Sequence, residues 1–244
     1  MKTLIIIPSR LSATRLPGKP LLKINGLSII SHVFKKAKDS DIGDVYVAAE
    51  DQEIIDDVKN NGGQAILTSN HHKTGTDRIY EALKKIGKPD IELVMNLQGD
   101  EPLMNVEDIR NLHNQMIKTK SEIGTLASKI NNKAIYLNQN VVKVLTKESL
   151  ENSEFPEALN FMRKSTSLVE NTYHHLGIYC YRSKALENFV SLDQSHNELH
   201  NKLEQLRALD NNIKINVTLA NESPIGVDTK EDFVAIKKIM EYKS

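Results

Sequence analysis

Three basic side chains lie within ten residues of one another near the start of the chain. Arg10, Arg15 and Lys19 stand among small and turn-forming residues in the segment PSRLSATRLPGKP, 8–20. Guanidinium and ammonium groups, with the backbone N–H groups of such a loop, suit a triphosphate. The spacing matches neither the G-x-x-x-x-G-K-S/T loop nor the G-x-G-x-x-G loop. A solvated basic loop is the alternative, but a loop that follows a strand favours the phosphate site.

An aspartate follows a second apolar run, in the segment NLQGDEP, 96–102. Mg²⁺ prefers oxygen ligands and commonly takes one or two carboxylates plus substrate phosphates. Asp100 is therefore the predicted metal ligand. It could instead cap the helix that follows, but Pro102 and Asn105 are better helix starts.

The segment GVDTKED, 226–232, carries a second candidate ligand, Asp228. Asp228 or Thr229 could equally cap the last helix, with Glu231 or Asp232 favourable to its dipole. The spacing alone supports capping and metal binding about equally.

Other reactive side chains carry weaker signals. His196 and His200 have helical i, i+4 spacing, but Glu does not follow the first of them as H-E-x-x-H requires, so no zinc site is predicted. The single cysteine, Cys180, is predicted to lie in the core. One cysteine excludes an intrachain disulfide and favours a reducing compartment, the cytoplasm.

The elements that must position these residues alternate between strand and helix in the first half of the chain. Short β-branched or apolar runs predict strands, and apolar residues at helical spacing predict helices. The predicted strands are 4–7, 44–49, 65–67 and 93–97, and the predicted helices are 27–38, 52–60 and 76–85. The basic loop and Asp100 thus both follow strands, so they share the carboxyl edge of a parallel sheet, where ligands bind.

The second half is less regular. Strands are predicted at 122–130, 140–145, 174–181 and 214–219, helices at 198–209 and 229–241, and 146–171 is polar without a clear period. The predicted fold is a Rossmann-like α/β domain, with a mostly parallel sheet flanked by helices and a partly antiparallel inserted region. We expect one domain over residues 1–244, with an elaboration around 120–210 for dimerisation or sugar binding.

Composition excludes several classes of protein. Charge is balanced, with 32 basic and 32 acidic residues in 244. This argues against nucleic-acid binding, which usually shows as a strongly basic domain. No stretch approaches the roughly 20 apolar residues that a membrane helix needs, so membrane insertion is not expected.

Taken together, the segments resemble the 3-deoxy-manno-octulosonate cytidylyltransferases, also called CMP-Kdo synthetases. The resemblance covers nearly the whole chain and is carried by the following segments: 5–30, HKTGTDR at 72–78, MNLQGDEP at 95–102, NQNVVKV at 138–144, HLGIYCYR at 175–182, LEQLR at 203–207 and GVDTKEDF at 226–233. It implies a nucleotidyltransferase of the nucleotide-diphospho-sugar transferase fold. Such an enzyme moves CMP from CTP to Kdo, with Mg²⁺ and as a homodimer, for lipopolysaccharide synthesis.

The resemblance also implies roles for individual residues. The catalytic group would be Lys19, Arg10, Arg15 and Asp100, and the metal ligands Asp100 and Asp228. The nucleotide would contact Ser9, Arg10, Lys19, Thr74, Gly75 and Gln98. The sugar acid would contact Arg78, Gln98, Arg163, His175, Tyr179, Glu204 and Gln205. No general base is evident. Arg78 could instead pair on the surface with Asp77, Glu81 or Glu101.

The sequence departs from the family pattern at three places, and two alternative functions remain. Arg163 matches the family arginine, but its neighbours in 161–167 do not, which puts this wall of the sugar site in question. Asn201 and Cys180 stand where the family commonly has glutamate and glycine. One alternative is a cytidylyltransferase for another sugar acid such as sialic acid. The other is a catalytically silent nucleotide-binding subunit.

Overall fold

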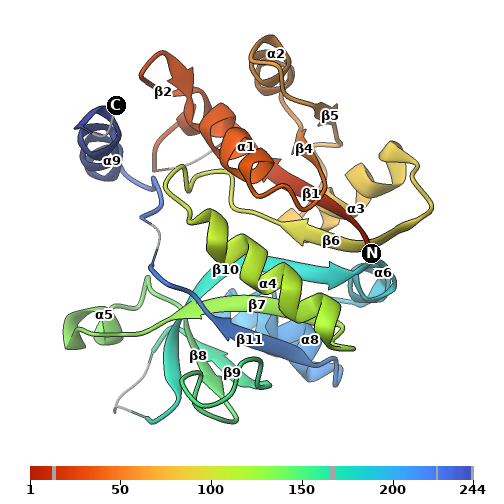
Figure 1. Ribbon diagram of the computed structural model, residues 1–244, viewed down its shortest axis with the longest axis vertical. Coiled ribbons are helices and arrows are strands. Elements are labelled where there is room, and N and C mark those ends of the chain that lie inside the picture. The colour runs from red at the N-terminus through yellow and green to blue at the C-terminus, as the bar shows by residue number, and fades with distance from the viewer. Residues whose placement is uncertain (13–14, 165–168, 224, 243–244) are drawn as a thin grey trace. The chain divides into compact units, whose positions relative to one another are not determined.

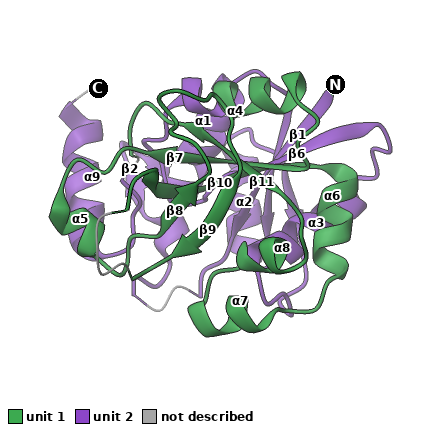
Figure 2. Cartoon of the chain, turned by 90° about the horizontal axis from the view of Figure 1, so that it is seen from below, with its two compact units in different colours: residues 1, 110–223 green, residues 2–109, 224–244 purple. Residues whose placement is uncertain are grey.

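The computed structural model describes residues 1–12, 15–164, 169–223 and 225–242. The chain divides into two compact units, coloured separately in Figure 2. Unit 1 comprises residue 1 and residues 110–223, and unit 2 comprises residues 2–109 and 224–244. None of the helices within the described ranges is long and apolar enough to cross a membrane.

Unit 2 contains a parallel sheet whose strands read β6, β1, β4, β5 across the sheet (Figure 1). Its strands are β1 (Lys2–Ser9), β4 (Asp44–Ala49), β5 (Ala65–Leu67) and β6 (Ile91–Asn96). All neighbours pair in parallel. The aliphatic run Leu4, Ile5, Ile6 and Ile7 has no exposed surface, as expected of a strand covered on both faces. The strands predicted at 44–49 and 65–67 are confirmed residue for residue.

Helices pack against these strands. The helices are α1 (Ile29–Asp39), α2 (Gln52–Asn60), α3 (Gly75–Ile86) and, after the chain returns to unit 2, α9 (Lys230–Tyr242). The hydroxyl of Ser28 caps α1 and that of Thr74 caps α3, each accepting a backbone N–H three residues on. Ile236 of α9 packs with Ile24 and Ile29. A short hairpin, β2 (Lys23–Ile24) and β3 (Leu27–Ser28), follows the 3₁₀ turn η1 (Lys19–Leu21).

Unit 1 is mainly antiparallel. Its strands are β7 (Ile123–Ser128), β8 (Lys143–Thr146), β9 (Ala158–Met162), β10 (Thr172–Arg182) and β11 (Ile215–Leu219). β10 pairs antiparallel with both β7 and β8, β8 pairs antiparallel with β9, and β11 pairs parallel with β7. The prediction of a mostly parallel α/β fold with a partly antiparallel region is confirmed.

The remaining helices differ from the sequence prediction. They are α4 (Val106–Lys118), α5 (Lys133–Leu137), α6 (Ser183–Ser191), α7 (His196–Asn201) and α8 (Leu206–Asp210). The single helix predicted at 198–209 is wrong, because Lys202 takes the left-handed conformation with φ 53° and ends α7. The segment 146–171, which is polar without a clear period in the sequence, contains β9. Ser165, Thr166 and Ser167 of the departure at 161–167 lie outside the described residues.

Candidate functional site

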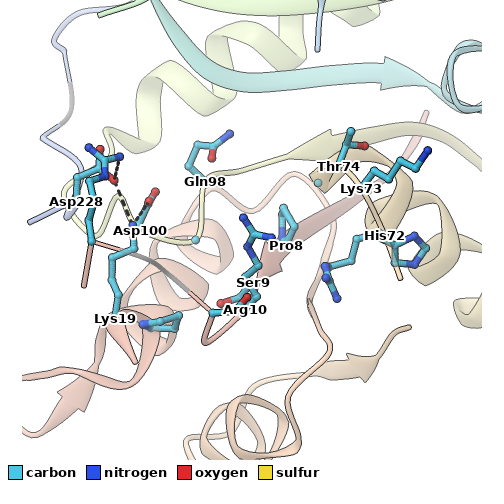
Figure 3. Close-up of a pocket in the computed structure, with 16 residues that line it drawn as sticks. Pro8, Ser9, Arg10, Lys19, His72, Lys73, Thr74, Gln98, Asp100 and Asp228 are labelled. Carbon is cyan, nitrogen blue, oxygen red and sulfur yellow. Dashed lines mark hydrogen bonds and ion pairs between the residues drawn. The ribbon is translucent and has the colours of Figure 1, made fainter. Parts of the chain in front are cut away.

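An open pocket of about 380 Å³ lies where β1 and β6 end in unit 2 (Figure 3). Its volume is in the range of small-molecule sites. The lining includes every residue of unit 2 predicted for the nucleotide, the metal or the sugar acid. The lining residues are Pro8, Ser9, Arg10, Ser12, Arg15, Lys19, Pro20, His72, Lys73, Thr74, Gly75, Arg78, Gln98, Gly99, Asp100 and Asp228.

Local backbone geometry brings the basic loop and the β6 loop together. Leu11 N–H donates to Asp51 Oδ2 at 2.7 Å, which ties the loop to the end of β4. Gly18 has φ 69°, a left-handed conformation that glycine adopts without strain, and it precedes the turn η1 that carries Lys19. A Cβ on Gly99 would lie 2.8 Å from the carbonyl oxygen of Pro8, so only glycine permits this approach. The close contact joins the two loops that carry the predicted ligands.

Lys19 stands between the two aspartates. Its Nζ lies 2.6 Å from Asp100 Oδ2 and 3.4 Å from Asp228 Oδ1. Arg15 Nη2 also approaches Asp228 Oδ1, at 3.1 Å. In Figure 3, Lys19, Asp100 and Asp228 gather at one end of the pocket, and His72, Lys73 and Thr74 lie at the other. One end of the pocket therefore carries two carboxylates, and the charged side chains along the rest of its lining are largely cationic.

The capping alternatives for the two aspartates do not hold. Asn105 Oδ1, not Asp100, accepts the N–H of Glu107 at the start of α4. At α9, Thr229 Oγ1 accepts the N–H of Asp232, while Asp232 Oδ2 accepts the N–H of Thr229. The side chains of Asp100 and Asp228 are therefore committed to the pocket rather than to helix ends.

Glu101 is a buried carboxyl group beside Asp100 and Asp228. Burial, with the negative charges of Asp100 and Asp228, raises the pKa of Glu101 to about 8. Its Oε2 atom is buried and has no hydrogen-bond partner among the described residues. Burial is the largest cause, so the neutral carboxyl form of Glu101 is favoured at neutral pH, and the two aspartate charges add to this effect.

The donor set fits a hard divalent cation. Asp100 and Asp228 place carboxylate oxygens around one point, the Lys19 ammonium. Within the described ranges, no group of three or more His, Cys, Asp or Glu side chains could hold a metal. Mg²⁺ rarely uses a full protein cage and usually takes one or two carboxylates plus phosphate oxygens and water. Two carboxylates beside a cationic pocket match that pattern.

Arg78 lines the pocket but is already well bonded. Its Nη1 donates to Thr68 Oγ1 at 2.7 Å and to the carbonyl of Ser69 at 3.3 Å, and its Nη2 pairs with Glu50. The residue is 4% exposed, so a surface pair with Asp77, Glu81 or Glu101 does not occur.

Sequence reasoning missed two groups around this pocket. Glu50 and Asp51 follow β4, and they hold Arg78 and Leu11 respectively. His72 lines the pocket and is hydrogen-bonded through Nε2 to Glu81. The sequence could have indicated Glu50 and Asp51, because they directly follow a predicted strand and so lie at the same sheet edge as the basic loop.

The predicted sugar-acid residues of unit 1 lie together. Tyr179, Glu204 and Gln205 line a small pocket of about 40 Å³, and the ring of His175 lies 5.4 Å from that of Tyr179. Arg163 Nη2 reaches the carbonyl of Lys202 at 3.4 Å, at the start of the LEQLR segment. Residues far apart in the sequence thus form one cluster.

Glu198 and Arg207, which lie on either side of Glu204 and Gln205 in the sequence, form a buried ion pair. Arg207 donates from Nε to Glu198 Oε2 at 2.8 Å and from Nη2 to Oε1 at 2.6 Å. Burial alone would raise the pKa of Glu198, but the hydrogen bonds from Arg207 and Gln194 hold it below its usual value. The Arg207 guanidinium also stacks 4.7 Å from the Phe189 ring centroid. This bidentate pair joins α7 to α8 across the turn.

Cys180 and the His196–His200 pair lie elsewhere in unit 1. The prediction that Cys180 lies in the core is confirmed. Cys180 is fully buried, and burial raises the pKa of its thiol to about 12, so the thiolate is not available at neutral pH. The rings of His196 and His200 stack 6.1 Å apart on α7, and no described acidic or cysteine side chain completes a metal site there.

Comparisons with known proteins agree with this geometry. The cytidylyltransferase family profile matches residues 4–215. A 3-deoxy-manno-octulosonate cytidylyltransferase of Afipia carboxidovorans is 42% identical over 240 residues, covering 98% of this chain and 96% of that protein. One from Rhodopseudomonas palustris (strain BisB18) is 43% identical over 242 residues and 98% of each chain. A solved CMP:2-keto-3-deoxy-manno-octonic acid synthetase, complexed with CTP, matches at a TM-score of 0.90 and 33% identity, covering 100% of both chains. The resemblance inferred from the motifs is confirmed.

Proposed function

Because this chain belongs to the cytidylyltransferase family, we propose that it transfers CMP from CTP to 3-deoxy-D-manno-octulosonate (Kdo) and releases pyrophosphate. The observation that carries the proposal is the pocket of unit 2. There Lys19 lies between Asp100 and Asp228, with Arg10 and Arg15 in the same wall. A nucleotidyl transfer needs this combination of cations for the triphosphate and carboxylates for a metal.

The reaction forms one bond and breaks another at the α-phosphorus. The oxygen of the anomeric hydroxyl attacks the α-phosphorus, the bond from that phosphorus to the bridging oxygen breaks, and pyrophosphate leaves with the electron pair. The hydroxyl proton passes to solvent. Arg10, Arg15 and Lys19 stabilise the negative charge that builds on the phosphate oxygens, and holding both reactants in place supplies much of the remaining acceleration.

Mg²⁺ is part of the proposal. Asp100 and Asp228 would hold it, as the approach of both carboxylates to one point, the Lys19 ammonium, supports. When bound, the ion would polarise phosphate oxygens and lower the pKa of a coordinated hydroxyl. Thr74 and Gly75, at the start of α3, and Gln98 would contact the nucleotide.

Binding of the sugar acid is assigned to the cluster of unit 1 and to Arg78 and Gln98. His175, Tyr179, Glu204 and Gln205 offer hydrogen-bonding groups against aromatic rings, which suits a polyhydroxylated ring. Homodimer formation, a cytoplasmic location and a place in lipopolysaccharide biosynthesis remain predictions from the resemblance. Exposed apolar side chains in unit 1, including Leu137 and Leu159, are compatible with a dimer contact.

Pyrophosphate release across a panel of acceptors tests the function. With CTP and Mg²⁺, we expect turnover with Kdo and little or none with sialic acid or with neutral sugar phosphates. Preference for sialic acid would move the chain to the other sugar-acid reaction. CTP binding without pyrophosphate release from any acceptor would mean a silent nucleotide-binding subunit.

Arg78→Lys tests the assignment of Arg78. A lysine keeps the charge but cannot reproduce a planar fork that serves Glu50, Thr68 and a substrate carboxylate. We expect kcat/KM for Kdo to fall about 30-fold or more, since losing a desolvated charged partner costs roughly 2–5 kcal/mol. CTP affinity measured without Kdo should stay within about threefold.

Thr68→Val is the matched variant for that test. It removes one hydrogen bond to Arg78 and leaves the guanidinium in place. If Thr68→Val loses as much Kdo specificity as Arg78→Lys, or if Arg78→Lys mainly weakens CTP binding, Arg78 is a structural part of the wall and not a sugar ligand.

A further inference from the structure

Strand β10 carries an irregularity between two of the residues assigned to the sugar acid. Leu176 pairs with Leu126 of β7, but the next pair joins Tyr179 to Thr125, so Gly177 and Ile178 are extra residues on β10. In a regular strand, residues 175 and 179 would lie about 13 Å apart. Here they face positions only two residues apart on β7, about 7 Å. The bulge therefore brings the His175 and Tyr179 rings to a centroid distance of 5.4 Å.

The hydroxyl of Thr125 closes this bulge. Thr125 is fully buried, and its Oγ1 lies 2.7 Å from the carbonyl oxygen of Ile178 and 3.3 Å from that of Leu176. The same oxygen lies 3.0 Å from His175 Nε2. One side-chain atom thus contacts two carbonyl oxygens at the bulge, those of Leu176 and Ile178, and the imidazole of His175 beside them.

A hydroxyl has one hydrogen, and this decides the direction of each bond. The shortest contact is to the Ile178 carbonyl, which can only accept, so the Thr125 hydrogen points there. The lone pairs of Oγ1 then face His175 Nε2, which must carry a hydrogen. Because one ring nitrogen's partner determines which nitrogen is protonated, Thr125 selects the Nε2–H tautomer.

The other ring nitrogen is left as an acceptor. Burial, with the neighbouring His174, lowers the pKa of His175 to about 3, so the ring is neutral at physiological pH. Among the residues that the structure describes, none hydrogen-bonds to His175 Nδ1. The edge-to-face contact with Phe161, at 4.9 Å and 78°, restricts rotation of the ring. A neutral acceptor held in one orientation suits a hydroxyl group and not a carboxylate.

We propose that Thr125 is a positioning residue for sugar-acid recognition. It holds the bulge that places His175 beside Tyr179, and it fixes His175 so that Nδ1 accepts a hydrogen bond from a hydroxyl of the sugar acid. This proposal rests on the proposed function, because it takes His175 as a sugar-acid ligand. It also gives His175 a specific role, which is recognition of a hydroxyl rather than of the carboxylate.

The test compares Thr125→Val with Thr125→Ser. Valine keeps the shape and removes the hydroxyl, whereas serine keeps the hydroxyl. We expect Thr125→Val to raise the KM for Kdo about 10- to 100-fold, with the KM for CTP within about twofold of the wild type, because the acceptor is no longer oriented. Thr125→Ser should restore the KM for Kdo to within about threefold. A lost fold would instead lower the active fraction and leave both KM values unchanged.

Ser128→Ala is the matched control. Ser128 lies on the same strand, is 4% exposed, and its hydroxyl has no hydrogen-bond partner among the described residues. Removing it should leave the KM for Kdo unchanged. An equal rise in KM for Ser128→Ala and Thr125→Val, or no rise for a folded Thr125→Val, overturns the proposal.

Imidazole ¹⁵N NMR of the wild type gives a readout that does not depend on any variant folding or on turnover. At pH 7 we expect the His175 signals of the Nε2–H tautomer, and in Thr125→Val a mixture of tautomers. An Nδ1–H tautomer in the wild type overturns the positioning role. A wild type with the expected tautomer but no pyrophosphate release with Kdo would instead contradict the proposed function, and with it the sugar-acid part of this inference.

Discussion

Asp100→Asn is expected to lower turnover with CTP and Kdo by about 10³-fold or more, while the unfolding temperature stays close to that of the wild type. The substitution keeps the shape and removes the charge that would hold the metal. Loss of metal stabilisation of the phosphate charge is worth several kcal/mol, and each 1.36 kcal/mol is a factor of ten in rate. The side chain is 30% exposed, so its contribution to folding is small.

Binding and a control separate this effect from a general loss of structure. Removing a negative charge beside the triphosphate should not weaken CTP binding measured without Mg²⁺. Asp90→Asn is the control. Asp90 lies just before β6, whereas Asp100 lies just after it, and Asp90 pairs with Lys2 on the surface. Asp90→Asn should be as active as the wild type. Normal activity of Asp100→Asn at saturating Mg²⁺ would remove Asp100 from the metal site.

The first half of the fold could be predicted because its signals are local. The run Leu4–Ile7 is apolar on both faces, which only a covered strand needs, and α2 carries Ile54, Ile55 and Val58 at helical spacing. The prediction of one helix over 198–209 was wrong because side-chain and backbone contacts across residue 202 stabilise a break in the helix. The Leu203 N–H bonds to Glu198 O, and Glu198 and Arg207 pair across the break. Helical spacing alone does not reveal such a partner.

Strand β9 was missed for a different reason. Among the described strands it pairs with β8 alone, and Leu159 is 54% exposed, so its sequence lacks the pattern of a covered strand. Short helices such as α5 likewise carry little periodic signal. These elements are defined by their neighbours rather than by their own residues.

The pocket of unit 2 was predictable because ligand residues in α/β folds follow strands. That rule placed Lys19 and Asp100 together before any contact was known. It could not decide between Asp228 and Thr229 as the cap of α9, since both residue types cap helices and they are adjacent. The structure distinguishes them, because Thr229 Oγ1 accepts the N–H of Asp232 in the first turn of α9. Nor could it reveal Thr125, whose role depends on the register of β10.

Lys19→Met is expected to lower kcat/KM for CTP by about 10²- to 10³-fold. Methionine has a similar length and no charge, so the change removes the ammonium that now lies 2.6 Å from Asp100 and 3.4 Å from Asp228. Two carboxylates then face the incoming triphosphate without their shared counter-ion. Losing one preorganised charge in a catalytic site typically costs factors of this size.

The effect of Lys19→Met on folding should be smaller than its effect on catalysis, because Asp100 and Asp228 are 30% and 48% exposed and water screens both pairs. Lys23→Met is the matched control. Lys23 lies four residues on, in β2, is exposed and lies outside the pocket, so its loss should leave kcat/KM within about twofold. Steady-state kinetics with varied CTP, beside thermal unfolding of both variants, measures the two effects separately. If Lys19→Met and Lys23→Met behave alike, with CTP affinity and turnover near the wild type, the 8–20 segment is a solvated basic loop and the triphosphate binds elsewhere.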